Sequence, residues 1–178
     1  MAKNCLLVSA GWLLTAREDR ACHIDWAFLI EDGIVSAMGP REDLAARYSA
    51  SAELSLHDHI VCHGLINCHN HAAMKLMRGL GQGLNLDDWL QQAIWPFEKE
   101  HLDAPTVGLG AELAIVEMLM SGITTFSDMY FFPETVASVA ERLGLNIQLA
   151  VPIIGLDTRW ARGSEACIHR ALALHDLY

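Results

Sequence analysis

The sequence lacks the features that mark a disulfide-stabilised, secreted or membrane-spanning chain. Its five cysteines are an odd number and contain no Cys-x-x-Cys pair, which argues against a disulfide framework and against a thiolate zinc site. No apolar run reaches the roughly 18 residues that a membrane-spanning helix needs. These absences favour a reducing, cytoplasmic setting.

Positive charge is also scarce. Twelve lysines and arginines stand against 22 aspartates and glutamates, so the formal net charge is -10. A surface of that sign repels phosphate backbones and anionic headgroups, which makes nucleic acid and membranes poor partners. The chain can still build a core, because 52% of its 178 residues are hydrophobic and its mean hydropathy is +0.23.

The first sixty residues predict a small β-rich domain. Two apolar runs, residues 27–30 and 34–38, flank Glu31-Asp32-Gly33, which is a hairpin signal, and Gly39-Pro40 should end the second strand. The other elements expected here are short: a helix at residues 43–48 and strands at residues 54–56 and 60–62.

From Gly64 onward, strands alternate with helices, a pattern that predicts a parallel sheet and an α/β fold. The strands are expected at residues 65–68, 123–126 and 146–154, and the helices at residues 87–100 (broken near Pro96), 106–121, 133–143 and 165–177. The first strand should be buried, because its character is apolar.

The helices carry their own signals. In the helix at residues 106–121 one apolar face is expected to be the packed one, and it is made by Leu109, Leu113, Val116 and Met120. Left-handed glycines should end two helices, at Gly122 and Gly144. Pro133 suits a first turn, and Ser164 could cap the last helix.

Two histidines stand at the end of the first strand. In Gly64-Leu65-Ile66-Asn67-Cys68-His69-Asn70-His71, an apolar segment runs into a His-x-His pair. Residues i and i+2 of a strand point to the same side, so His69 and His71 could together hold a divalent metal. The pair His57 and His59 has the same spacing in a polar stretch, and we interpret it as a solvent-facing loop.

The residues that follow this pair extend the pattern. Ala72–Gly79 leads on to Trp89-Leu90 and then to Trp95-Pro96-Phe97-Glu98. Over residues 64–130 the sequence resembles the amidohydrolase superfamily. Within it, the resemblance is to the metal-dependent deaminases of S-adenosylhomocysteine and methylthioadenosine, to which the triazine chlorohydrolases are related.

This resemblance implies a (β/α)8 barrel whose first strand carries the metal ligands His69 and His71. Residues 1–60 would supply strands of a β-sandwich, and residues 61–178 the first three β/α units. A whole barrel needs eight units and about 250 residues, so the chain would be truncated. The other metal ligands and the catalytic acid and base would then lie beyond Tyr178, which leaves the catalytic residues unknown.

The resemblance also implies ligands. The cofactor would be one divalent metal, Zn2+ or alternatively Fe2+, and the substrate a small purine nucleoside; a homodimer is compatible with it. The glutamate of Trp-Pro-x-Glu, here Glu98, would accept hydrogen bonds from ribose hydroxyls, unless it is a surface glutamate. Trp89 would be an apolar wall for the adenosyl group or an anchor of its own helix. Arg159 and Arg162 would bind a homocysteine carboxylate or lie in solvent, and Asp128 is left without a role.

The function expected is hydrolytic deamination of an adenosine-type nucleoside with release of ammonia. The alternatives are another amidohydrolase, such as a guanine deaminase or a triazine-type hydrolase, and an inactive structural relative. One departure weakens the case for any single substrate: Gly81-Gln82-Gly83 replaces acidic residues that are common in the resembling proteins. Lys75 and Arg78 are expected to be structural, and His101, His169 and His175 to lie on helix surfaces.

Overall fold

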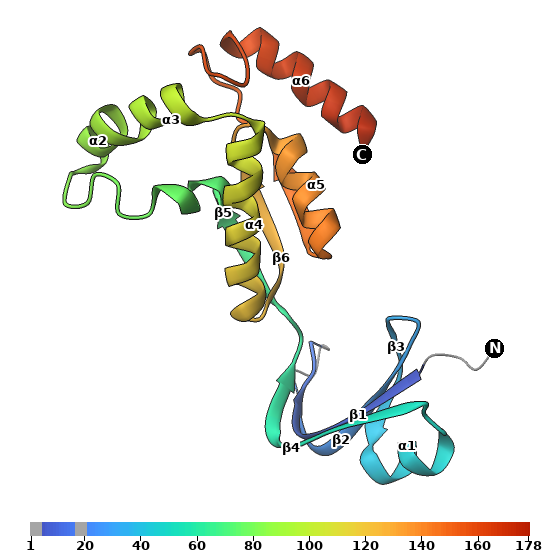
Figure 1. The fold of residues 1–178 in the computed structure, drawn as a ribbon. Coiled ribbons are helices and arrows are strands. Elements are labelled where there is room, and N and C mark those ends of the chain that lie inside the picture. Colours follow the sequence, from blue (N-terminus) through green and yellow to red (C-terminus); the bar gives the residue numbers. More distant parts are fainter. Residues whose placement is uncertain (1–4, 17–20) are drawn as a thin grey trace. The chain divides into compact units, whose positions relative to one another are not determined.

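The computed structural model describes residues 5–16 and 21–178. The chain divides into two compact units, Met1–His63 and Gly64–Tyr178, which are described separately. Figure 1 gives the element labels used below.

The first unit is a four-stranded sheet in the order β3-β2-β1-β4 with one helix. Strand β1 pairs antiparallel with β2 and parallel with β4. A small core forms where Leu7, Ala27 and Leu29 of the sheet pack against Leu44 of the helix. The elements are β1 (Cys5–Leu14), β2 (Cys22–Glu31), β3 (Ile34–Pro40), α1 (Arg41–Arg47) and β4 (Ala52–Cys62).

The predicted hairpin is confirmed. Strands β2 and β3 are antiparallel, and between them Asp32 and Gly33 have φ angles of 50° and 82°. Two consecutive positive φ angles are the mark of a type I′ turn, which matches the twist of paired strands. Strand β3 ends at Pro40, as the sequence predicts.

The prediction of a loop at His57 and His59 is wrong, because both residues lie on the single strand β4. Both are exposed, as predicted. The pairing of β1 with β4 is irregular at this point: Ala10 pairs with Leu56 and Trp12 with Ile60, so one residue of β1 stands opposite residues 57–59 of β4. Gly11 fills that position, and a Cβ atom there would overlap the carbonyl oxygen of His57. The absence of a side chain therefore lets the two strands pass closely, and residues 54–62 do not break into two strands.

The second unit is a parallel three-stranded sheet in the order β5-β6-β7, which confirms the predicted strand-helix alternation. Helix α4 contacts both α5 and strand β6, and Figure 1 shows the two helices running along that strand. Phe126 of β6 is fully buried among them. The elements are β5 (Leu65–Asn70), α4 (Ala104–Met120), β6 (Ile123–Met129), α5 (Pro133–Leu143), β7 (Asn146–Ala150) and α6 (Gly163–Leu177).

The helix ends follow the sequence signals in part. Gly122 and Gly144 have φ angles of 77° and 76°, so the predicted left-handed stops are confirmed, and Pro133 opens α5. Helix α6, however, begins at Gly163 with Arg162 at its N-cap and no side-chain cap. The cap predicted at Ser164 is wrong because Ser164 already lies inside the helix.

The first strand of this sheet is not buried, contrary to the prediction. Leu65 is 52% exposed and Ile66 is 63% exposed. Both lie on β5, which is an edge strand of the three-stranded sheet. An apolar strand with that exposure is suited to further strands and to contacts that residues 64–178 do not supply.

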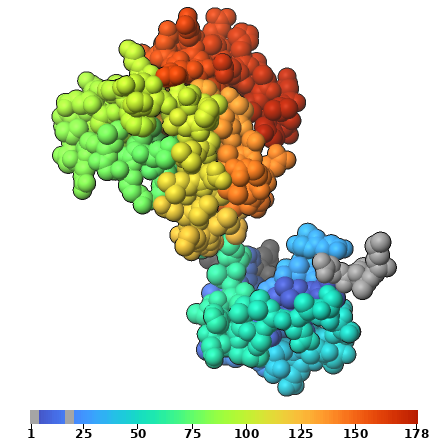
Figure 2. Space-filling model, viewed as in Figure 1, coloured from blue at the N-terminus to red at the C-terminus, as the bar shows by residue number. Residues whose placement is uncertain are grey.

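The face of α4 that packs is the opposite of the predicted one. Leu109 is 60% exposed and Met120 is 84% exposed, and Figure 2 shows α4 at the surface of the second unit. Helix α4 instead packs its small residues against η1 (Ala72–Met77), a 3-10 helix that the sequence analysis did not predict. Gly110 is the point of closest approach, because a Cβ there would lie 2.5 Å from the carbonyl oxygen of Ala73. Hydrophobicity alone could not reveal that close packing favours glycine and alanine here.

Residues 86–101 are helical throughout, so the break predicted near Pro96 is wrong. Three segments follow one another: α2 (Leu86–Trp89), the π-helical η2 (Leu90–Ile94) and α3 (Trp95–His101). Pro96 has no N–H to donate, and it lies in the first turn of α3. The wide π turn before it lets the chain continue as a helix.

Two further observations concern the chain as a whole. In the described ranges, no helix combines the length and the apolar character needed to cross a membrane. The five cysteines all fall within these ranges, and all of them are free.

Candidate metal and substrate site

The His-x-His pair lies at the carboxyl end of β5. His69 is on the strand and His71 follows it directly. Their ring centroids are 4.9 Å apart, with the ring planes at 77° to each other. The structure therefore brings the two imidazoles together at one edge of the sheet.

A backbone carbonyl fixes the ring of His71. Its Nδ1 atom is 2.6 Å from the carbonyl oxygen of Met129, at the end of β6. A carbonyl can only accept, so Nδ1 carries the proton and Nε2 keeps its lone pair. This is the tautomer of a metal ligand that binds through Nε2.

Sequence reasoning did not find this partner, because a backbone carbonyl leaves no trace in a sequence. The register of the sheet supplies the only available signal. Strands β5 and β6 are parallel and Asn70 pairs with Asp128, so the residue after Asn70 comes beside Met129. The position, rather than the identity, of Met129 makes it a partner for His71.

Asp128 supports the same edge from within. It is 1% exposed, and its Oδ1 accepts a hydrogen bond from the N–H of Ala72 at 2.6 Å. This contact holds the backbone immediately after His71. Burial raises the pKa of Asp128 to about 6, although the Ala72 N–H and the nearby His71 act in the other direction. Its Oδ2 is buried and has no hydrogen-bond partner among the described residues.

These residues fit a divalent metal, but only as part of its site. The two imidazoles are ligands of a kind that zinc accepts, and the unpaired Oδ2 of Asp128 favours positive charge nearby. A catalytic zinc usually has three protein ligands. Across residues 5–16 and 21–178, no group of three or more His, Cys, Asp or Glu side chains could hold an ion. A site with three protein ligands would therefore need at least one from outside these residues.

Glu98 of α3 is tied to the same strand end. The hydroxyl of Tyr130, the residue after β6, donates a 2.6 Å hydrogen bond to Oε1 of Glu98. Burial raises the pKa of Glu98, while that hydrogen bond and the nearby His71 oppose the rise. Burial also raises the pKa of Tyr130, with a further contribution from Glu98, so the phenol keeps its proton and donates.

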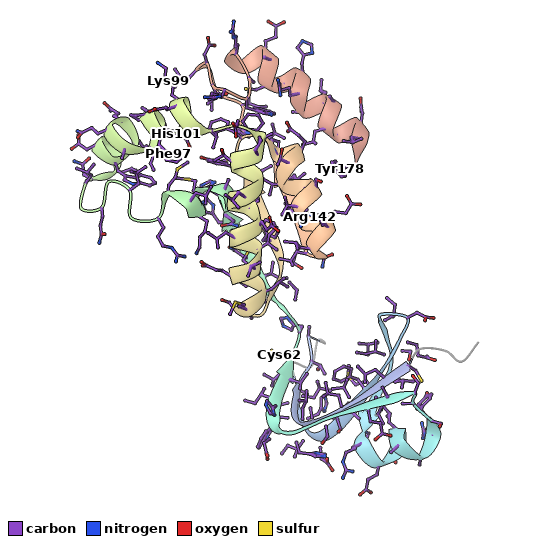
Figure 3. All side chains as sticks on the ribbon, viewed as in Figure 1. Cys62, Phe97, Lys99, His101, Arg142 and Tyr178 are labelled. Atoms are coloured by element: carbon purple, nitrogen blue, oxygen red, sulfur yellow. The ribbon has the colours of Figure 1, made fainter. Side chains whose placement is uncertain are left out.

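Glu98 lines a cavity of about 560 Å3 between α3 and the segment that follows β7. Trp95 and Phe131 contribute apolar walls, and the charged lining includes Arg159 and Arg162. Lys99, labelled on α3 in Figure 3, lines the same cavity. The structure thus brings together Glu98 and the two arginines that the sequence analysis placed near a substrate.

Trp89 lies elsewhere. It is not among the residues that line this cavity. Its indole N–H donates a 2.9 Å hydrogen bond to the carbonyl oxygen of Leu80, and its ring packs against the core of the second unit. These contacts match the alternative reading of Trp89 as an anchor, and its contact with substrate stays a prediction.

The residues expected to be structural behave accordingly. Lys75 and Arg78 both form ion pairs with Glu117 of α4, the latter at 2.8 Å. They therefore tie η1 and the turn after it to α4. The three helix-surface histidines are more than half exposed and lie beside acidic neighbours: His101, His169 and His175.

A family model decides the relationship. The model of the amidohydrolase family matches residues 60–175. The chain belongs to the amidohydrolase family. Among the curated relatives, one from Saccharophagus degradans is named 5-methylthioadenosine/S-adenosylhomocysteine deaminase. It is 42% identical over 173 residues, which are 97% of this chain and 39% of that protein. A relative of the same name from Pyrococcus furiosus is 40% identical over 131 residues, 74% of this chain and 30% of that protein.

Solved structures of related proteins have the same fold as this chain of the amidohydrolase family. An adenosine deaminase from Xanthomonas campestris, with bound zinc, matches with a TM-score of 0.93 at 34% identity, over 97% of this chain and 39% of that one. The chlorohydrolase TrzN from Arthrobacter aurescens, complexed with zinc, matches in fold with a TM-score of 0.84 at 22% identity, over 97% of this chain and 43% of that one. The α/β fold is therefore that of the amidohydrolase barrels, and the chain spans about two-fifths of the length of the curated relatives it matches first.

Proposed function

We propose that these residues form the N-terminal part of a metal-dependent hydrolytic deaminase of adenosine-type nucleosides. The observation that carries the proposal is the joint arrangement of His71 and Glu98, each held by one of two consecutive residues at the end of β6. The deaminase names of relatives up to 44% identical support it, as does the 34% identical adenosine deaminase with bound zinc. Methylthioadenosine, S-adenosylhomocysteine and adenosine are the candidate substrates.

His69 and His71 are the proposed metal ligands in this chain. A divalent ion, when bound, lowers the pKa of water so that hydroxide is available near neutral pH. His71 would use Nε2, because its Nδ1–H is donated to Met129. Zinc is the proposed ion, since two related structures contain it.

The cavity that Glu98 lines would bind the nucleoside. Glu98 accepts hydrogen bonds from the ribose hydroxyls through the lone pairs that Tyr130 leaves available. Trp95 and Phe131 exclude water from the apolar part of the substrate. Arg162, with Arg159, would face a homocysteine carboxylate, if the substrate carries one.

The reaction adds water to C6 of the adenine ring and releases ammonia, which leaves an inosine-type product. A proton must move from the attacking water to the departing amine. No residue of this chain is assigned that task, so the proposal places the proton-transfer group, together with the remaining metal ligands, on further strands of the barrel. We call the protein in which these strands accompany residues 1–178 the assembled enzyme. A cytoplasmic setting is also proposed, and the five free cysteines support it.

The proposal is tested by metal content and ammonia release in the assembled enzyme. His69→Ala and His71→Ala should each lower bound zinc and abolish ammonia release from adenosine-type nucleosides. The control is His57→Ala. His57 belongs to the other His-x-His pair, on β4, and its replacement should leave zinc content and ammonia release unchanged. Full metal content in both site variants would show that the ion binds elsewhere. Ammonia release from guanine or a triazine, with none from a nucleoside, would replace the proposed substrate class.

A further inference from the structure

Tyr130 has a contact that the proposed reaction does not by itself require. Its hydroxyl reaches Glu98, 32 residues away along the chain, at 2.6 Å. Tyr130 is only 6% exposed, so its hydroxyl is not free to turn toward solvent. A phenol has one proton to donate, and a short bond to a carboxylate is among the stronger hydrogen bonds of proteins. Oε1 of Glu98 is thereby held in one place.

The engaged oxygen limits what Glu98 can offer to a ligand. A free carboxylate rotates and presents either oxygen, whereas this one is pinned through Oε1 on the Tyr130 side. Among the residues that the structure describes, no second donor is bonded to the Glu98 carboxylate. Oε2 therefore keeps both lone pairs for a donor in the cavity that Glu98 lines.

The chain between the two functional groups would not fix their separation well. From His71 to Glu98 it passes through turns in which three glycines have positive φ angles: Gly79, Gly81 and Gly83. The end of β6 offers a shorter route. Three consecutive residues make these contacts. Asp128 holds the backbone after His71, Met129 holds the ring of His71, and Tyr130 holds Glu98.

We propose that Tyr130 is a positioning residue that makes the site select for sugar hydroxyls. It sets Glu98 at a fixed offset from His71 and leaves Oε2 to accept a ribose hydroxyl. The inference rests on the proposed function, because it gives the orientation of the carboxylate in that same site. Tyr130 itself need not contact the substrate.

The test is Tyr130→Phe in the assembled, metal-loaded enzyme, with adenosine and 2′,3′-dideoxyadenosine compared as substrates. Phenylalanine keeps the ring that packs 5.4 Å from Phe131 and removes only the hydroxyl. We expect kcat/KM for adenosine to fall about tenfold, mainly through KM, since one hydrogen bond to a charged group is lost. For the dideoxynucleoside we expect a change of less than about twofold, because it lacks the 2′ and 3′ hydroxyls from which Glu98 would accept hydrogen bonds.

Two comparisons separate positioning from general damage. Tyr48→Phe removes the same hydroxyl from an exposed tyrosine of the first unit and should leave both substrates unaffected. In a Glu98→Gln background, Tyr130→Phe should cost little more, because it acts through a carboxylate that is already absent. If Tyr130→Phe leaves the ratio of kcat/KM between the two substrates unchanged, the inference is overturned while the proposed function stands.

If the assembled enzyme deaminates neither nucleoside, the positioning role of Tyr130 can still be tested by measuring the equilibrium binding of both nucleosides by calorimetry. Tighter binding of adenosine in the wild type, lost in Tyr130→Phe, would support the positioning role and reject the deaminase. Equal binding of the two nucleosides in the wild type would overturn the positioning role. Binding of neither would overturn both proposals.

Discussion

A single methyl group at Gly110 would test how helix α4 supports the histidine edge of the sheet. A Cβ atom at this position would lie 2.5 Å from the carbonyl oxygen of Ala73 and 2.9 Å from its Cα. Both are backbone atoms of η1, which begins directly after His71. They cannot rotate away as a side chain would, so Gly110→Ala must push α4 and η1 apart.

The size of the effect follows from two opposed contributions. Alanine is favoured over glycine inside a helix by about 1 kcal/mol. Overpacking of a tight contact costs about 1–3 kcal/mol, and an obstacle made of backbone belongs at the upper end of that range. The expected net result for Gly110→Ala is a loss of about 1–2 kcal/mol in the free energy of unfolding.

Gly108 provides the matched control, on the same helix and two residues earlier. A Cβ there would lie 3.4 Å from Cγ2 of Thr135, which is an ordinary contact with the end of a side chain. Helix propensity should therefore dominate, and Gly108→Ala should gain about 0.5–1 kcal/mol. The two substitutions are chemically identical and are expected to have opposite signs.

Urea denaturation of the assembled enzyme, followed by far-UV circular dichroism, would give both values if the slopes match those of the wild type. Zinc content should fall in Gly110→Ala and not in Gly108→Ala, because only the first displaces the backbone next to His71. A Gly110→Ala protein at least as stable as the wild type, with normal zinc, would refute the close approach of α4 to Ala73.

Three further predictions concern charge and completeness. Glu98→Gln should lower kcat/KM for an active ribonucleoside about tenfold and leave a free-base substrate within about twofold, as steady-state kinetics would show; equal kinetics on every ribonucleoside would exclude the role of Glu98. In metal-free protein the folded state raises the pKa of Asp128 from 3.8 to about 6. The contribution of Asp128 to the free energy of unfolding is therefore fully present below pH 3.8 and is lost as the pH rises through 6. That loss amounts to about 3 kcal/mol, it should be absent in Asp128→Asn, and denaturation at a series of pH values would measure it. Residues 1–178 alone should neither release ammonia nor form a stable monomer, because the edges of the three-stranded sheet and the apolar face of α4 are uncovered in the described residues; a monomeric core protected from hydrogen exchange, with metal-dependent turnover, would contradict this.

Local signals were sufficient where one residue decides the local backbone. Gly122, Gly144 and Pro133 mark helix boundaries that the structure has, because each restricts or permits particular φ angles. The alternation of strands and helices likewise needed only the hydrophobic pattern. Neither signal depends on what a segment packs against.

The sequence could not decide burial or the partners of the site. Leu109 and Met120 form an apolar face, but α4 packs through Gly110 because the η1 backbone lies against it. Their spacing, together with the resemblance of the surrounding residues, singles out His69 and His71, and the structure brings their rings together. The contacts that orient His71 and Glu98 come from Met129 at the end of β6 and from Tyr130 just after it. These residues are 58 positions from His71 and 32 positions from Glu98 along the chain, and the strand register brings them together.

The position of the two histidines at the end of an edge strand has a consequence for assembly. Strand β5 borders the three-stranded sheet, and its two imidazoles are short of the ligands that a catalytic zinc requires. An ion that takes its other ligands from further strands would link two parts of the barrel. Its binding free energy would then count toward the association of those parts. Two separately produced fragments should consequently recombine more tightly with zinc than with a chelator, and their recombination would report the free zinc concentration.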